Sequence, residues 1–146
     1  MTVFSPNHVN FEIVENALRA MADYFDYEFY LIDNESMIVE DHSGFKLEVI
    51  LYQENNIISM KCSTIADNTN SIEHAHLVCN HLNNHTPLIR FSALEIPKMG
   101  QGYRGTEILI KSSHDTFYDK GLHLDQFIYN AHYLLTSSKS LVNKNF

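Results

Sequence analysis

The stretch FKLEVILYQENNIISMKCSTI, residues 45–65, decides the fold that this sequence predicts. Apolar and polar residues alternate through residues 45–53, as in a strand with one side in a core, and the core side carries Phe45, Leu47, Val49 and Leu51. Glu54-Asn55-Asn56 favours a turn, after which the alternation resumes through residues 57–65, with Ile58, Met60 and Cys62 on the core side. The stretch therefore predicts two antiparallel strands joined by a tight turn.

Four further strands are predicted around this hairpin. Residues 27–32 and 37–40 flank the turn-rich segment Asp33-Asn34-Glu35-Ser36, and they predict a hairpin that precedes the first. Residues 88–96 and 106–111 predict two later strands, joined by a long loop that contains glycine. The chain thus supplies six strands, four of them in succession.

Three stretches show the spacing of three and four residues between apolar side chains that is typical of amphipathic helices. The first follows Asn10, a favourable N-cap, and carries Phe11, Val14, Leu18, Met21, Ala22 and Phe25. The second begins at Asn70 or Ser71, ends before Pro87, and carries Ile72, Ala75, Cys79 and Leu82. The third carries Leu124, Phe127, Ile128, Ala131 and Leu135, and the polar residues after Thr136 are expected to fray.

The order of elements is therefore α-β-β-β-β-α-β-β-α, which predicts the α+β class, with one largely antiparallel sheet and three helices. The chain has 146 residues, the size of one domain, and no low-complexity segment or linker divides it. We expect a single domain that spans residues 1–146.

The charge is concentrated in the first part of the chain. Residues 1–60 hold eleven acidic and two basic residues, a net charge of −9, while the whole chain carries −8. An acidic surface repels phosphate backbones, so nucleic-acid binding is not expected. A solvated acidic face is the simplest explanation, and a docking surface for basic protein segments is the alternative.

The chain shows no sign of export or membrane insertion. The first ten residues lack a basic start and an apolar segment of signal-peptide length, and no apolar run approaches the roughly 18 residues that a membrane span needs. Cys62 and Cys79, the two cysteines, lie in a strand pattern and on an apolar helix stripe, where buried free thiols are expected. We expect a cytoplasmic protein without a membrane partner.

Two motifs resemble catalytic signatures, but neither has the context that its chemistry requires. The segment Gly100-Gln101-Gly102-Tyr103-Arg104-Gly105 has the spacing GxGxxG, but a strand follows it where a dinucleotide site needs a helix. The segment Ser112-Ser113-His114-Asp115 contains the three residue types of a hydrolase triad, but consecutive residues cannot align the three groups, and a polar turn is expected. We expect no enzyme and no cofactor.

Histidines offer an alternative function of a different class. His74, His81 and His85 fall near one another on the second predicted helix, and two imidazoles four residues apart can reach one metal ion. A solvated set of histidines is the simpler explanation, because this side of the helix lies away from its apolar stripe. A regulator that binds a metal with these histidines, or a ligand with the loop from Lys98 to Gly105, remains the alternative.

Apolar residues also occur on the side of the strands that faces away from the helices. If Leu47 and its partners face the core, the opposite face carries Ile50, Tyr52, Leu94, Ile96 and Leu109. Three helices can hardly cover both faces of a six-stranded sheet, so this second face would stay exposed or be buried by another polypeptide. We expect burial against a second copy of the chain, in a homodimer, or against a protein client, and local cover by the second or third helix is the alternative.

The whole pattern resembles a known family. The order of elements over residues 9–136 and the acidic composition, with the local features Asn80, Asn83-Asn84, Arg90-Phe91-Ser92, Gly121 and Leu124, are similar to the YbjN-like family of bacterial sensory transduction regulators and to the type III secretion chaperone fold. The resemblance implies small acidic homodimers that hold an extended segment of a client over apolar grooves. The sequence therefore predicts a chaperone-like or regulatory protein-binding module.

Overall fold

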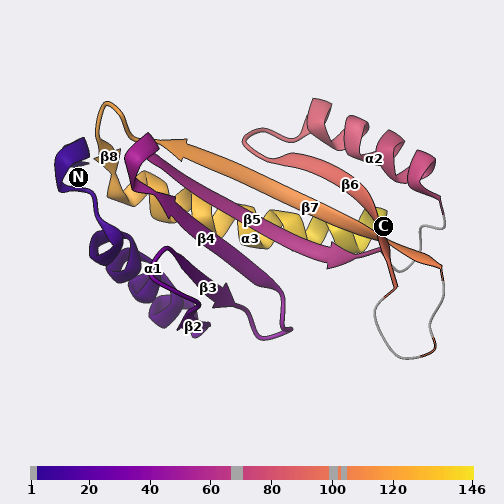
Figure 1. Ribbon diagram of the computed structural model, residues 1–146, viewed down its shortest axis with the longest axis horizontal. Helices are drawn as coiled ribbons and strands as arrows, with labels where there is room; N and C mark the ends of the chain where they lie inside the picture. Colours follow the sequence, from indigo (N-terminus) through magenta and orange to yellow (C-terminus); the bar gives the residue numbers. More distant parts are fainter. Residues whose placement is uncertain (1–2, 67–70, 99–101, 103–104) are drawn as a thin grey trace.

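The computed structural model describes residues 3–66, 71–98, 102 and 105–146, and its centre is an antiparallel sheet of six strands (Figure 1). The strands follow the order β2-β3-β4-β5-β7-β6 across this sheet. They are β2 (Glu28–Leu31), β3 (Ser36–Glu40), β4 (Lys46–Tyr52), β5 (Ile57–Ile65), β7 (Thr106–Phe117) and β6 (Arg90–Pro97). Two short strands that the sequence did not predict, β1 (Val3–Phe4) and β8 (Leu122–His123), form a separate antiparallel pair.

Besides two short 3-10 helices, Pro6–His8 and Gln53–Asn55, the described residues form three α-helices, which confirm the predicted α+β class and, apart from β1 and β8, the predicted order of elements. The α-helices are α1 (Phe11–Phe25), α2 (Ile72–His85) and α3 (Leu124–Asn145). α1 packs against β2, β3 and α3, while α3 runs along β4, β5 and β7, and α2 lies beside β6 (Figure 1). No described helix has both the length and the apolar character needed to cross a bilayer.

The helix ends follow from the residues that the sequence singled out. The Asn10 side chain accepts a hydrogen bond from the backbone N–H of Ile13 at 3.0 Å and caps α1. Ser71 caps α2 in the same way, while the alternative cap, Asn70, lies outside the described residues. Thr86, just before Pro87, has an extended backbone, as a residue before proline prefers, and the helix ends at His85.

One face of the sheet packs against the helices and holds the core. Alternate strand residues on this face are almost fully buried, as the 45–65 stretch predicted, and they include Leu47, Val49, Leu51, Ile58, Met60, Cys62, Ile108 and Ile110. The helices contribute their own apolar stripes, such as Leu18 and Met21 of α1 and Phe127 and Leu135 of α3. Burial of these apolar side chains is the main free-energy gain that holds the sheet and helices together.

α3 is longer than the sequence predicted, and the expectation of a frayed tail after Thr136 was wrong. The helix continues to Asn145, and Ser138 and Val142 are buried against the sheet. Ser138 and Val142 follow Leu134 at intervals of four residues, so all three lie on the same side of the helix. The sequence did not predict this extension because the polar serine interrupts the run of apolar side chains. The end of the helix therefore belongs to the core.

This burial predicts that Val142→Ala destabilises the protein. The substitution removes two methyl groups from a site that is 6% exposed, so the free energy of unfolding should fall by about 1–2 kcal/mol. Urea denaturation measures the change, and Asn143→Ala, on the exposed side of the same turn, is the matched control. Equal stability of the two variants would contradict the packing of this segment.

β7 is also longer than predicted, because it continues through residues 112–115, where the sequence analysis expects a polar turn. Ser112-Ser113-His114-Asp115 lies within the strand, paired with β5 from Cys62 to Ser59. Polar side chains are tolerated here because Ser113 and Asp115 lie on the face away from the helices. Ser112 is buried on the other face, next to Cys62, where a small hydroxyl fits the core.

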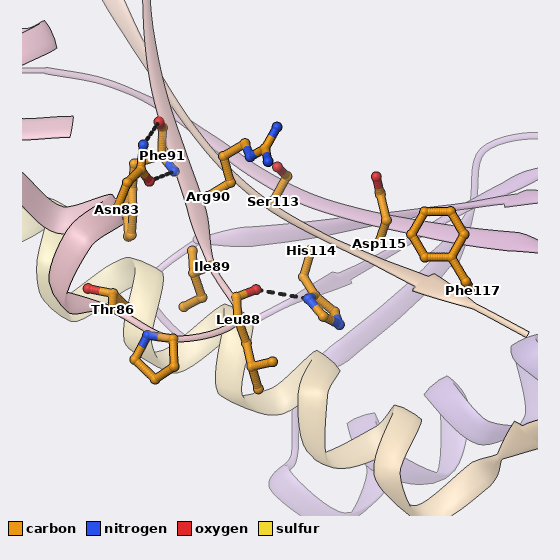
Figure 2. Close-up of a pocket in the computed structure, with 11 residues that line it drawn as sticks. Asn83, Thr86, Leu88, Ile89, Arg90, Phe91, Ser113, His114, Asp115 and Phe117 are labelled. Atoms are coloured by element: carbon orange, nitrogen blue, oxygen red, sulfur yellow. Dashed lines mark hydrogen bonds between the residues drawn. The ribbon is translucent and has the colours of Figure 1, made fainter. Parts of the chain in front are cut away.

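The outer edge of β6 is covered by α2. The Asn83 side chain accepts a hydrogen bond from Phe91 N at 2.6 Å and donates one to Phe91 O at 2.9 Å, as Figure 2 shows. Nε2 of the His76 ring lies 3.2 Å from the backbone carbonyl oxygen of Ala93. Side chains of α2 thus form hydrogen bonds with backbone groups that an exposed edge strand would offer to another chain.

Replacing Asn83 tests this edge cover. Asn83→Ala leaves the N–H and C=O of Phe91 without partners, so the free energy of unfolding should fall by about 1–3 kcal/mol. Asn84→Ala, at the next position and also exposed, should change stability little. Thermal unfolding of the two variants compares them, and indistinguishable melting temperatures would show that the Asn83 contacts do not hold α2 in place.

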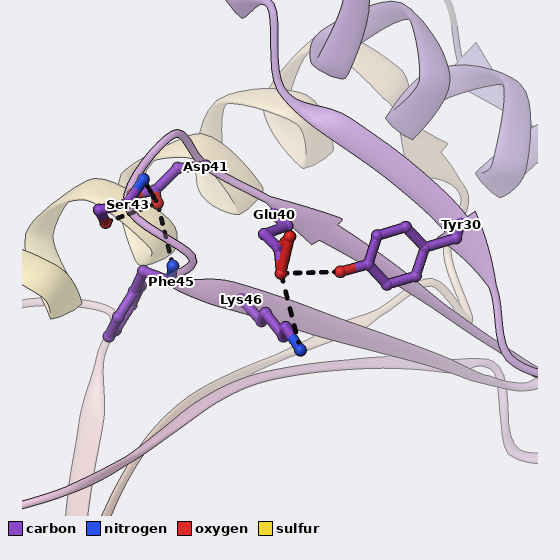
Figure 3. Close-up of polar contacts among 6 residues, drawn as sticks. All are labelled: Tyr30, Glu40, Asp41, Ser43, Phe45 and Lys46. Carbon is purple, nitrogen blue, oxygen red and sulfur yellow. Dashed lines mark hydrogen bonds and ion pairs between the residues drawn. The ribbon is translucent and has the colours of Figure 1, made fainter.

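Aspartates begin both tight turns in the first half of the sheet. Asp33 Oδ1 accepts hydrogen bonds from the N–H groups of Glu35 and Ser36. Asp41 Oδ1 accepts bonds from Ser43 and Phe45 N in the turn between β3 and β4 (Figure 3). Asp41 Oδ2 also lies 3.0 Å from Lys139 Nζ, which ties this turn to α3.

The Asp41 carboxylate makes the free energy of unfolding depend on pH in the acid range. Burial alone would raise its pKa, but hydrogen bonds from Ser43 and Phe45 and the ammonium of Lys139 outweigh burial and lower the pKa below the ordinary 3.8. A lowered folded-state pKa stabilises the protein above the unfolded value, and this stabilisation is lost as the pH falls through the folded value. Asp41→Asn should therefore lower stability at neutral pH and flatten its decline below pH 3.8.

Urea denaturation from neutral pH down into this acid range measures both effects. Asp119→Asn, at an exposed position, is the control and should retain the pH profile of the unmodified chain. A parallel profile for Asp41→Asn would show that the pair with Lys139 does not contribute to folding.

Candidate protein-binding surface

The second face of the six-stranded sheet, which we call the open face, carries the side chains that point away from the core. Residues directly opposite one another in an antiparallel pair lie on the same face, so the strand register identifies its members. One row runs across Tyr52, Ile57 and Phe117, from β4 through β5 to β7. A parallel row at the other end of the sheet runs across Ile65, Leu109 and Leu94.

These rows form two apolar clusters at opposite ends of the open face. The first, the Tyr52 cluster, consists of Ile50, Tyr52, Ile57 and Phe117. The second, the Leu94 cluster, consists of Ile65, Leu94, Ile96 and Leu109. Tyr52 is 45% exposed, Leu94 52% and Phe117 66%, so each cluster presents large apolar side chains to solvent.

Charged side chains fill the space between the two clusters. Lys61 Nζ lies 3.3 Å from Glu48 Oε1 across the β4–β5 pair, and both residues are partly exposed. Lys111 and Arg90 lie on the same face in β7 and β6. Near the β2 edge, Glu40 accepts a hydrogen bond from the Tyr30 hydroxyl at 2.9 Å and lies 3.6 Å from Lys46 Nζ (Figure 3).

The structure places all five predicted interface residues on the open face, but it does not join them in one patch. Ile50 and Tyr52 belong to the Tyr52 cluster, whereas Leu94, Ile96 and Leu109 belong to the Leu94 cluster. The sequence also did not single out Ile57, Ile65 and Phe117, which the register adds to the same clusters. Phe117 lay beyond the predicted end of its strand, and only the alternation that continues through Ser113 and Asp115 pointed to it.

Of the four histidines of α2, the three predicted as possible metal ligands, His74, His81 and His85, are brought together only in part. The rings of His81 and His85 lie 4.3 Å apart, and His85 Nδ1 is 2.8 Å from the backbone carbonyl of His81. Within the described residues, no group of three or more histidine, cysteine or acidic side chains is arranged to hold a metal ion. The set His74, His81 and His85 therefore does not form a three-ligand centre.

Neither catalytic motif assembles a site in the part of the chain that the structure describes. Along β7, Ser112 and His114 lie on the face opposite to Ser113 and Asp115, so the four side chains do not converge. Most of the GxGxxG segment, namely Gly100, Gln101, Tyr103 and Arg104, lies outside the described residues. Lys98 donates a backbone hydrogen bond to Gly105 O at 3.0 Å, which closes the connection between β6 and β7 as a hairpin.

Both cysteines are buried free thiols, as predicted. Burial raises the pKa of the Cys62 thiol to about 12, against the opposite effect of the neighbouring hydroxyls of Ser112 and Ser138. Burial also raises the pKa of Cys79. The nucleophilic thiolate is therefore disfavoured at both positions.

A pocket lies where β6 begins, next to the end of β7 (Figure 2). The loop residues Thr86, Pro87 and Leu88 form one side, and Arg90, Ser113, His114, Asp115 and Phe117 are among the residues that line the rest. His114 Nδ1 lies 2.8 Å from Leu88 O, which ties the loop to β7. The pocket thus opens beside the Tyr52 cluster, with which it shares Phe117.

No protein-family model matches the chain, and no curated protein sequence matches it either. The chain is similar in structure to YbjN of E. coli, which is described as a candidate transcription regulator. The TM-score is 0.60 over 87% of this chain and 86% of YbjN, at 13% sequence identity. A likeness at this identity shows a shared fold, which is the fold that the resemblance implied.

Proposed function

We propose that the protein is a non-enzymatic protein-binding module of the regulatory or chaperone-like kind, and that it binds through the open face of its sheet. The observation that carries this proposal is the pair of exposed apolar clusters on a face that the described helices leave open. Large exposed apolar side chains on a rigid surface are typical of protein-binding sites.

The distribution of charge favours a second copy of the chain as the occupant. In the band between the clusters, β2 to β4 carry Glu28, Glu40 and Glu48 with one base, Lys46, whereas β5, β7 and β6 carry Lys61, Lys111 and Arg90 with one acid, Asp115. A two-fold axis parallel to the strands would place the acidic half of one copy over the basic half of the other. The same axis would set the Tyr52 cluster, which spans β4, β5 and β7, against its counterpart, whereas the Leu94 cluster, on β5, β7 and β6, would lie over β2 to β4 of the other copy.

Regulation through protein contacts also fits the charge better than DNA binding. Five acidic and four basic side chains lie on the open face, and the whole chain carries a net charge of −8. A DNA-binding surface needs a clear excess of basic residues. The buried free thiols of Cys62 and Cys79 suit a reducing compartment such as the cytoplasm.

The experiment combines one substitution in each cluster with a measurement of mass in solution. The unmodified chain should behave as a dimer in light scattering, whereas Leu94→Lys and Tyr52→Lys should shift it towards the monomer by at least tenfold in the dissociation constant. Both positions are about half exposed, so the fold should survive, which circular dichroism checks. Tyr24→Lys, at an exposed site on α1, is the control.

The outcomes distinguish the two occupants. A monomeric wild-type chain at high concentration would rule out the second copy. If such a monomer captures a protein from its native cell, and both cluster variants lose this capture while Tyr24→Lys retains it, the occupant is a client. Unchanged mass and unchanged capture in both cluster variants would overturn the role of the open face.

A further inference from the structure

β7 extends four residues beyond the strand that should cover its outer side. β6 begins at Arg90, which is paired with Ser113, and no strand among the described residues pairs with residues 114–117 on this side. On the other side, β5 remains paired with β7 as far as Phe117, opposite Ile57. The end of β7 is therefore held as a strand by β5 alone, with one free edge.

The hydrogen bonds of α2 show which backbone groups point to this edge. Because the side chains of Asn83 and His76 reach Phe91 and Ala93, the backbone groups of these two residues point away from β7. The alternate residues of β6, including Arg90, then point towards β7 and pair with Ser113 and its alternates. By the same alternation, the N–H and C=O groups of Asp115 and Phe117 point to the free edge.

The neighbouring loop leaves space beside this edge. Leu88 would lie opposite Asp115 if β6 continued, but its backbone has φ of 68°, and this left-handed conformation turns the chain away from the strand. The contact from His114 Nδ1 to Leu88 O fixes the turn. The resulting space is the pocket of Figure 2, lined by Pro87, Leu88, Arg90, Asp115 and Phe117 among others.

We propose that an extended peptide binds in this pocket as an added strand, antiparallel to the end of β7 and in line with β6. Its backbone would exchange hydrogen bonds with Asp115 and Phe117, the mode of recognition known as β-strand addition. The inference goes beyond the open face, because it assigns a second binding site and the chemistry of its ligand.

The side chains around the free edge define the peptide sequence. Residues opposite Phe117 and Asp115 would place their side chains on the open face. An apolar side chain next to Phe117 continues the row from Tyr52 and Ile57, and a basic side chain next to exposed Asp115 pairs with its carboxylate. In the antiparallel direction the preferred order is therefore apolar, any residue, basic.

The test uses a fluorescein-labelled peptide of three Thr-Val-Thr-Lys repeats and fluorescence anisotropy. Saturable binding is expected, and no saturation up to about 1 mM peptide would overturn the proposal. Methylation of the backbone nitrogens of Val and Lys, which would face β7, should weaken binding at least tenfold. Methylation of the Thr nitrogens, which would face solvent, should weaken it less, and equal loss with the two peptides would exclude the proposed pairing.

Asp115→Pro is the matching change in the protein. Proline removes the N–H that points to the free edge but no hydrogen bond to β5, and edge positions tolerate it. Binding should fall at least tenfold. Unchanged binding by a folded Asp115→Pro variant would overturn the proposal. If this variant does not fold, the methylated peptides decide.

Asp115→Asn tests the contribution of the carboxylate charge separately from that of the backbone N–H group. The unmodified protein should prefer the Lys peptide over one in which each Lys is Glu, and part of this preference would come from the net charge of −8. The preference should shrink in Asp115→Asn, which keeps the N–H group. An undiminished preference would contradict the pairing of a basic residue with Asp115.

Leu94→Lys keeps this test independent of the proposed function. Leu94 lies in the other cluster, far along the sheet from Asp115, so the variant should bind the peptide like the unmodified chain even where it disrupts the dimer. Loss of peptide binding in Leu94→Lys would assign the peptide to the open face and overturn the site at the end of β7. Retained binding together with a failed dimer test would leave this site intact and reject only the second copy.

Discussion

The packing of α3 along β4, β5 and β7 is the contact on which the rest of the structure depends. The buried side of this helix, from Phe127 to Val142, covers the strand residues that alternate inward, including Leu47, Met60 and Ile110. Because side chains in a strand alternate between faces, fixing one face against α3 also fixes every residue on the other. The open face, with both of its apolar clusters, is thus a direct consequence of the register that the core imposes.

The sequence predicted the parts of the fold that rest on local alternation and helix capping. It showed the hairpin of residues 45–65, the cap at Asn10 and the order of elements apart from β1 and β8, and it gave Ser71 as one of two candidate caps for α2. The prediction from the sequence was wrong where a buried polar residue interrupted an apolar pattern. Ser138 hid the second half of α3, and Ser112 to Asp115 hid the second half of β7, because a small hydroxyl in a core is decided by tertiary packing.

The candidate surface was predicted in composition but not in layout. Alternation along one strand was enough to place Ile50, Tyr52, Leu94, Ile96 and Leu109 away from the helices. Their division into two clusters depends on which residues of distant strands face one another, and this register is set by pairing between strands and cannot be read from one of them. The free edge of β7 depends in the same way on where β6 begins, and hence on the backbone of Leu88.

The separation of the two clusters limits which molecules can use the whole open face. Ile57 and Ile65 lie at the two ends of β5, eight residues apart, so the clusters are separated by about 26 Å along this strand. A short or flexible molecule that reaches one cluster gains the binding energy of that cluster alone. A rigid body long enough to span both gains the second contact at a high effective concentration, and its overall affinity rises steeply. If the open face binds as proposed, this spacing favours long, stiff partners over short or flexible ones.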